Sequence, residues 1–209
     1  MIDPRTEPHR PHLWPDLPRV YLAGKIEAND WRHDVVTGLR GAWSNDLPDP
    51  MRPETWCDWP VWPGAVCDGL GDYVGPYFVS CDHACTHGAS THATSGGCND
   101  APVDDARAFV HRQCLDALHC ADLVFAWLDD RTAYGTLVEL GYAAALRKRV
   151  VIAHPGDLRL VRDMWFALAS CAPGDVIATT SPVDTLRDLL SSRIGWQAPA
   201  KLALAEVSR

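Results

Sequence analysis

The hydrophobic residues of this chain fall into short runs, and the stretches between the runs carry a helical repeat. The runs at 123–127 and 150–153 are uninterrupted, and further strands are indicated at 19–23 and 176–178. An apolar run of this length with polar residues at both ends is typical of a strand buried on both faces. Strands that alternate with helices predict an α/β fold with a doubly wound, mostly parallel sheet of the Rossmann or flavodoxin-like type.

The stretches between the runs place apolar residues at helical spacing. One helix is predicted to start at Asp30, which can cap it, and to run to about residue 43 with Trp31 and Val35 on its apolar face. Further helices are predicted from residue 103 onward and over residues 136–147, 163–169 and 182–192.

The chain divides into one domain with less regular ends. Residues 1–18 are rich in proline and predict an extended lead-in, residues 19–196 form a single α/β domain, and residues 197–209 form a peripheral tail. Within the domain, residues 44–104 form a long irregular insertion rich in Cys, His and Trp. A loop of this length is expected to be functional or to contain further structure, and residues 77–80 are a candidate strand.

A polar loop and a helix start lie between the two uninterrupted runs. Asp129, Asp130 and Gly135 follow the first run, and Thr136 and Glu139 open the helix. A purely structural interpretation is a capping box, in which Thr136 caps the helix and Glu139 reaches back to it. The functional interpretation is that these residues face a ligand, because small ligands bind at the carboxyl ends of such strands.

The pattern Gly-Thr-x-x-Glu-x-Gly-x-Ala at 135–143 resembles the nucleoside 2-deoxyribosyltransferase family. The strand and loop at 20–26 and the helical segment 112–122 resemble the same family. The resemblance implies cleavage of an N-glycosidic bond, with Glu139 as nucleophile and Asp130 near the departing base. The residues expected to bind the substrate are Tyr21, Gly24, Lys25, Trp31, Arg32, Gly135 and Thr136.

Four positions depart from the family pattern. The acidic helper usually found one or two residues before the motif glycine is replaced by Ala133 and Tyr134, and Gln113 stands where an Asp is common. Lys25 is a cation in the substrate loop and, with Arg32 nearby, would suit a phosphate. A nucleotide or modified nucleoside is therefore favoured as substrate. The acceptor of the glycosyl group, water or another base, stays open.

In a second functional interpretation, a ligand binds in a crevice at the same strand ends but no reaction is catalysed. In this alternative the chain is a nucleotide-binding or nucleotide-sensing module. It would bind a nucleoside or nucleotide and release no base.

Cysteine and histidine are concentrated at residues 81–92. Zinc binding there is one interpretation, because zinc prefers four nitrogen or sulfur ligands, but the spacing does not match a standard finger or ribbon. A second interpretation places Asp82 and His83 in the substrate pocket, and a third is a solvated polar loop. Elsewhere Cys114, Cys120 and Cys171 are expected to be free thiols.

The overall composition limits the partners. The net charge of −8 provides no basic surface for polymeric nucleic acid, and no apolar run reaches the roughly 20 residues of a membrane span. A cytoplasmic location and a small-molecule partner, a nucleoside or nucleotide, are expected. No cofactor is required, since no Gly-x-Gly-x-x-Gly follows the first strand. The family resemblance implies a homo-oligomer, and Trp165 and Phe166 are expected in the core or at its interface.

Overall fold

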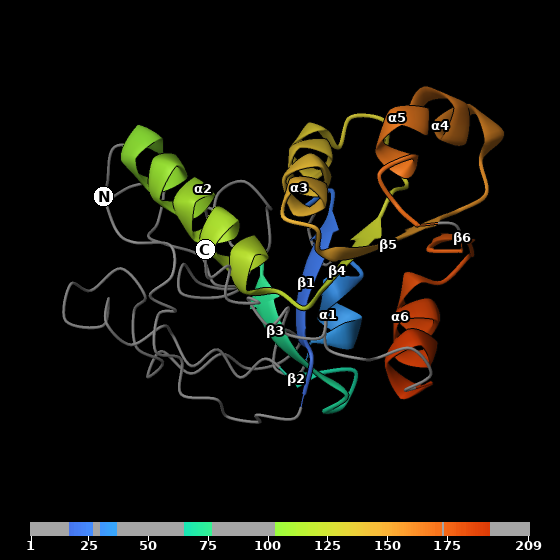
Figure 1. The fold of residues 1–209 in the computed structure, drawn as a ribbon, viewed down its shortest axis with the longest axis horizontal. Helices are drawn as coiled ribbons and strands as arrows, with labels where there is room; N and C mark the ends of the chain where they lie inside the picture. The colour runs from blue at the N-terminus through green and yellow to red at the C-terminus, as the bar shows by residue number, and fades with distance from the viewer. Residues whose placement is uncertain (1–16, 27–29, 37–64, 77–102, 173, 193–209) are drawn as a thin grey trace, which may run out of the picture.

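A six-stranded sheet forms the centre of the molecule (Figure 1). The computed structural model describes residues 17–26, 30–36, 65–76, 103–172 and 174–192. The predictions for the lead-in, the tail and most of the insertion, including the candidate strand at 77–80, lie outside the described residues. The strands are β1 (Arg19–Gly24), β2 (Ala65–Val66), β3 (Gly71–Gly75), β4 (Leu123–Trp127), β5 (Arg149–His154) and β6 (Val176–Ala178).

The order of the strands confirms the predicted fold class. The sheet runs β2-β3-β1-β4-β5-β6, and every pairing is parallel except that of β2 with β3. Counted along the chain, the parallel strands therefore lie in the flavodoxin-like order, second-first-third-fourth-fifth. The order reverses between β1 and β4, and such a switch point opens a crevice at the carboxyl ends of the two strands.

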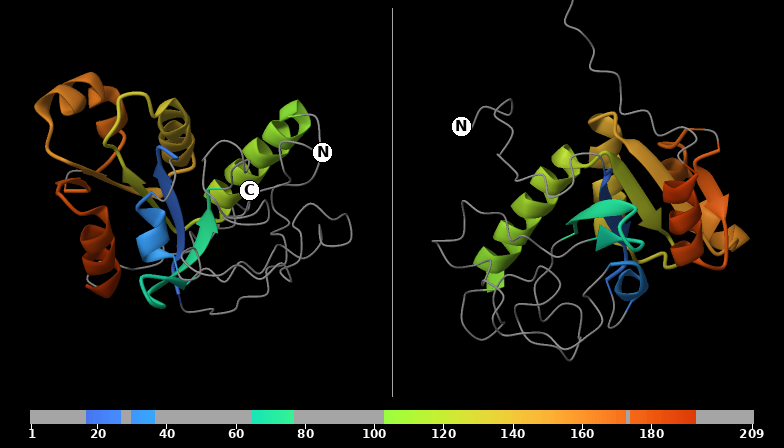
Figure 2. Two further views of the ribbon diagram at one scale, coloured as in Figure 1. Left: turned by 180° about the vertical axis from the view of Figure 1, so that it is seen from behind. Right: turned by 90° about the horizontal axis from the view of Figure 1, so that it is seen from below.

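Helices cover both faces of the sheet. The helices are α1 (Arg32–Val35), α2 (Val103–Cys120), α3 (Tyr134–Ala145), α4 (Leu158–Asp163), α5 (Trp165–Leu168) and α6 (Pro182–Ser191). On one face α2 contacts α3, and on the other α1 contacts α6 (Figures 1 and 2). Within the described ranges, no helix is both long enough and apolar enough to cross a membrane.

The central strands are held in register at both ends. All five residues of β4 are buried, which explains why its sequence is apolar at every position. At the amino ends, the backbone N–H and guanidinium of Arg19 donate to Asp122 at 2.9 Å. At the carboxyl ends, Gly24 lies opposite Trp127. This register sets the relative positions of the two loops that leave β1 and β4.

The helix predicted over residues 30–43 is interrupted at Val36, and residues 37–43 lie outside the described residues. Val36 is extended, with φ −100° and ψ 116°, and forms an antiparallel bridge with Val66. A β-bridge therefore takes the place of helix at this position. Strand β2, which supplies Val66, and its neighbour β3 both lie within the insertion. The sequence did not predict β3 because the strand is short and has glycine at both ends.

Two further details differ from the sequence prediction. The helix expected at 163–169 is divided at Met164 into α4 and α5, and Asp157 caps α4 by accepting from the Arg159 N–H at 2.8 Å. Trp165 and Phe166 on α5 are 65% and 74% exposed, so they are not core residues. Within the described ranges, Cys114, Cys120 and Cys171 form no disulfide, as predicted.

Two glycines show where close packing is needed and where it is not. A Cβ on Gly75 in β3 would lie 2.6 Å from Cε2 of the Tyr21 ring and 2.8 Å from its Cδ2. The Tyr21 ring thus occupies the space that a side chain at position 75 would take. Gly141 in α3 faces open space instead.

We predict that alanine has opposite effects on stability at these two positions. Gly75→Ala should lower the free energy of unfolding by about 1–3 kcal/mol, because the Tyr21 ring or β3 must move. Gly141→Ala should raise it by about 0.5–1 kcal/mol, since alanine favours an exposed helix interior. Urea unfolding of both variants tests this, and a Gly75→Ala protein as stable as the parent would contradict the packing described.

Candidate active site

The candidate site lies at the carboxyl ends of β1 and β4, at the switch point of the sheet. The loop after β1 carries Lys25, and the loop after β4 carries Asp130. Helix α3 follows the second loop and brings Glu139 back over the sheet, where α3 contacts β1 and β4. Residues distant in the sequence therefore meet at one edge.

The capping-box interpretation of Thr136 and Glu139 is wrong. Helix α3 begins at Tyr134, two residues before the predicted start, and its N-cap is Ala133 with no side-chain capping bond. Thr136 is thus inside the helix and buried. Thr136 and Glu139 therefore form no capping box, and the carboxylate of Glu139 can contact another part of the molecule.

Glu139 is held by a tyrosine from β1. The Tyr21 hydroxyl donates to Oε1 of Glu139 at 2.5 Å. Tyr21 is completely buried, and burial together with the neighbouring Glu139 carboxylate raises the pKa of its hydroxyl well above the ordinary value. Tyr21 therefore stays protonated and acts as a permanent hydrogen-bond donor to Glu139.

The ionisation of Glu139 is balanced near neutrality. Burial raises the pKa of Glu139 to about 7, against the opposing effects of the Tyr21 hydrogen bond and the Arg32 charge. Desolvation is the largest of these influences because a carboxylate loses much of its hydration in a protein interior. At neutral pH both the acid and the carboxylate forms are populated, which is the range suited to catalysis.

Lys25 and Asp130 form an ion pair that joins the two loops. The Lys25 ammonium donates to Oδ2 of Asp130, and the other oxygen accepts from the backbone N–H and the hydroxyl of Thr132, each at 2.7 Å. The Lys25 hydrogen bond and then those from Thr132 hold the pKa of Asp130 far below its usual range. Asp130 is thus a carboxylate that accepts hydrogen bonds and has no proton to give a departing base.

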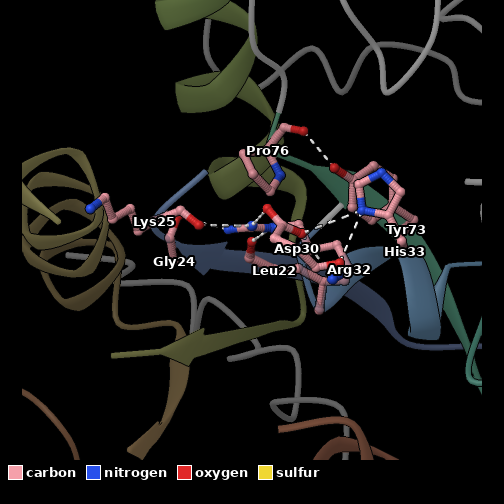
Figure 3. Close-up of polar contacts among 8 residues, drawn as sticks. All are labelled: Leu22, Gly24, Lys25, Asp30, Arg32, His33, Tyr73 and Pro76. Atoms are coloured by element: carbon pink, nitrogen blue, oxygen red, sulfur yellow. Dashed lines mark hydrogen bonds and ion pairs between the residues drawn. The ribbon is translucent and has the colours of Figure 1, made fainter. Parts of the chain in front are cut away.

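Arg32 is buried beneath the loop after β1 (Figure 3). Its guanidinium donates to the carbonyl oxygens of Leu22 at 2.8 Å, Gly24 at 2.7 Å and Lys25 at 3.3 Å, and to Asp30 at 2.6 Å. These contacts fix the end of β1. The sequence suggested a phosphate-binding role for Arg32, but this arrangement assigns its donors to the backbone and to Asp30.

Gly24 and Trp31 complete the packing around Arg32. Gly24 has φ +151°, and a Cβ there would lie 3.0 Å from the Trp127 carbonyl and 3.1 Å from the Arg32 guanidinium. Glycine is therefore required for the loop to pass so close to β4. Trp31 packs edge-on against Phe125, with ring centroids 5.7 Å apart.

The remaining residues predicted for the site either make no close contact or lie outside the described residues. Gly135 is exposed with open space around its Cα. Asp82, His83 and the proposed zinc segment at 81–92 lie outside the described residues. The structure adds two residues that the sequence analysis did not select for the site, Asp30 beside Arg32 and Cys114 beside Tyr21. Cys114 lies in α2, and only the tertiary structure brings it to Tyr21.

A comparison with known protein families finds a similarity over part of the chain. The model of the nucleoside 2-deoxyribosyltransferase family matches residues 73–164, which span the chain from β3 to the end of α4. The resemblance seen in the motif around Glu139 is thereby confirmed over this segment. No curated protein and no solved structure gave a significant match.

The raised pKa of Glu139 predicts how stability depends on pH. The folded state holds the proton more tightly than the unfolded state, so the parent protein should lose stability as pH rises from about 4.5 to about 7, relative to Glu139→Gln. This relative loss in the free energy of unfolding should reach roughly 3 kcal/mol and stay constant at higher pH. Chemical unfolding of both proteins at several pH values measures it, with Val138→Ala as a control on the exposed face of α3. If the free energies of unfolding of the parent and Glu139→Gln changed in parallel with pH, the assigned pKa would be contradicted.

Proposed function

We propose that this site cleaves the N-glycosidic bond of a nucleoside, with the Glu139 carboxylate as nucleophile. The observation that carries the proposal is the Tyr21–Glu139 hydrogen bond at the switch point of the sheet. It holds a carboxylate of intermediate pKa at the edge where ligands of such folds bind. The match of residues 73–164 to a nucleoside 2-deoxyribosyltransferase domain supports the same chemistry.

In the proposed reaction, one oxygen of Glu139 attacks the anomeric carbon of the sugar. The carbon–nitrogen bond breaks, its electron pair leaves with the base, and the base takes a proton from solvent. The product is an ester between the sugar and Glu139. Attack on the same carbon by water, or by the nitrogen of a second base, releases the carboxylate and completes hydrolysis or transfer.

The surroundings of Glu139 suit both stages of this reaction. Desolvation raises the basicity of the carboxylate, which makes it a better nucleophile than a fully hydrated one. The Tyr21 hydroxyl occupies Oε1 and orients the group, leaving the second oxygen for the sugar. When the ester breaks, the same hydroxyl and the nearby Arg32 charge stabilise the returning carboxylate.

The charges of the crevice favour a neutral substrate. Lys25 is paired with Asp130, and Arg32 is paired with Asp30 and with backbone carbonyls. Each of these cations is therefore already balanced by a carboxylate, and Glu139 adds further negative charge when ionised. We therefore propose a nucleoside in preference to a nucleotide, which revises the suggestion drawn from Lys25 and Arg32 in the sequence.

Asp130 has a revised role in this proposal. As a permanent carboxylate it accepts hydrogen bonds, either from an N–H of the base or from Lys25. It also holds the loop after β4 against the loop after β1. The proton that the departing base needs is thus not supplied by Asp130.

Substitution of the nucleophile tests the function directly. Glu139→Gln should reduce the release of free base from nucleosides by at least about a thousandfold, whereas Val138→Ala, one residue away on the exposed face, should remain active. In the parent, kcat/KM should rise about tenfold per pH unit below pH 7 and level off above it, because the carboxylate form reacts. Chromatography with mass detection of free base measures both.

The same experiment separates catalysis from binding alone. Nucleosides that shift the melting temperature of the parent without release of base would support the non-catalytic binding module. Base release that persists in Glu139→Gln would reject Glu139 as nucleophile. A mass increase of the parent by one sugar residue, absent in Glu139→Gln, would identify the covalent intermediate.

Removal of the Asp130 charge tests the proposed substrate class. Asp130→Asn should leave Lys25 without its carboxylate partner, so the Kd of a nucleoside 5′-monophosphate should fall about tenfold relative to that of the nucleoside. Calorimetry measures both constants, and Asp163→Asn, which removes the exposed Arg131–Asp163 pair, is the matched control. A parent protein that already prefers the monophosphate would contradict the proposal.

A further inference from the structure

Large apolar side chains are exposed on three neighbouring helices. Helix α3 contacts α5, and α5 contacts α4, so the three form one continuous part of the surface (Figures 1 and 2). Within the described ranges, every exposed large hydrophobic side chain belongs to these helices, and each is between 63% and 83% exposed. We call this surface the apolar patch, and its members are Tyr134, Val138, Leu158, Trp165 and Phe166.

The outer side of α3 is as free of charge as its inner side. Glu139 is the only charged residue of the helix, and it is turned to Tyr21. The positions that point away from the sheet are all exposed, and they are Tyr134, Val138, Gly141 and Ala145. A surface helix normally carries polar side chains on its outer face, whereas a helix that is apolar all round is covered on both sides.

The apolar patch has the area that a protein dimer needs. A standard interface buries about 800 Å² per partner, of which about 65% is apolar in homodimers, so roughly 500 Å² of apolar surface is required. An aromatic side chain has about 150–250 Å² to bury, so Tyr134, Trp165 and Phe166, which are 65% to 74% exposed, provide roughly 400 Å². Val138 and Leu158 supply the remainder.

The charges of this surface permit two copies to meet. The chain has a net charge of −8, so two copies repel each other unless the surfaces in contact carry little of that charge. A symmetric interface joins a surface to itself, so a charged surface would meet its own charge there. Helices α3, α4 and α5 have no net charge, because their charged residues are two arginines and two acids: Arg159, Arg162, Glu139 and Asp163.

We propose that the apolar patch binds a second copy of this chain in a symmetric dimer. Helices α3 and α5 of one protomer pack against the same helices of its partner. Trp165 and Phe166 lie at the centre, because aromatic residues contribute most of the binding energy of interfaces and these two rings pack edge to face, with centroids 5.5 Å apart. The inference goes beyond the proposed function and does not rest on it.

Charged substitutions in the apolar patch test the dimer. Trp165→Glu and Phe166→Glu each place two carboxylates in the interface, one from each protomer. Either change should raise the dissociation constant of the dimer by at least about a hundredfold. Sedimentation velocity over a range of protein concentrations measures the constant, and circular dichroism verifies that each variant is folded.

Two control variants separate the patch from general effects of charge and of truncation. Ser191→Glu adds the same charge to the exposed end of α6, on the other face of the sheet, and should leave the dissociation constant unchanged. Val138→Ala keeps the patch apolar and should change the constant by no more than about tenfold. Oxidative footprinting of the parent needs no variant: Trp165 and Phe166 should be protected in the dimer and oxidised after dilution.

The outcomes decide between a second copy and other coverings of the patch. A parent that is monomeric at every concentration would overturn the proposal, and so would a dimer that is equally stable in Trp165→Glu and Phe166→Glu. Protection of Trp165 that persists in a monomer would assign the patch to another segment of the same chain, which also overturns it. Release of base from nucleosides tests the proposed function separately.

Discussion

The hydrogen bond between Tyr21 and Glu139 is the interaction on which the site depends. It joins the first strand to helix α3, two elements that are distant along the chain, and it does so where the strand order reverses. Glycine at position 75 leaves room for the phenol ring, and the pairing of β1 with β4 places the ring beneath the helix. A change in any of these features would move the carboxylate away from the crevice.

The two ion pairs of the crevice serve different purposes. Arg32 is buried and binds the backbone carbonyls that end β1, so its charge is part of the framework. Lys25 and Asp130 are each about one third exposed and join the loops that follow β1 and β4. The first pair holds the end of β1, and the second places two opposite charges at the surface.

Much of the fold could be predicted from the sequence because its central strands are buried on both faces. Such strands give uninterrupted apolar runs, and β4 and β5 were found within one residue of their bounds. Strand β3 was missed because its pairing with β1, and not its own composition, makes it a strand. Helix α1 was predicted too long because its apolar spacing is also compatible with the β-bridge that ends it at Val36.

The roles of the site residues stay predictions. Glu139 and Tyr21 were selected because the motif at 135–143 and the strand at 20–26 resemble the nucleoside 2-deoxyribosyltransferase family, and in the structure a hydrogen bond joins them. The local pattern around Thr136 could not decide between a helix cap and a catalytic motif, since both use the same residues at the same spacing. The partners of Arg32 were beyond prediction because they are backbone oxygens, whose positions depend on how the strand ends.

The burial of Arg32 has a consequence for how the site responds to salt. Ions in solution screen charges over about 10 Å at 0.1 M, but they act weakly on a pair enclosed by protein. The attraction between Arg32 and the Glu139 carboxylate is therefore a constant of the fold, whereas the Lys25–Asp130 pair weakens as ions accumulate at the surface. The two loops thus carry one ion pair that salt should weaken, whereas the charge of Arg32 beside the Glu139 carboxylate should respond little to ionic strength.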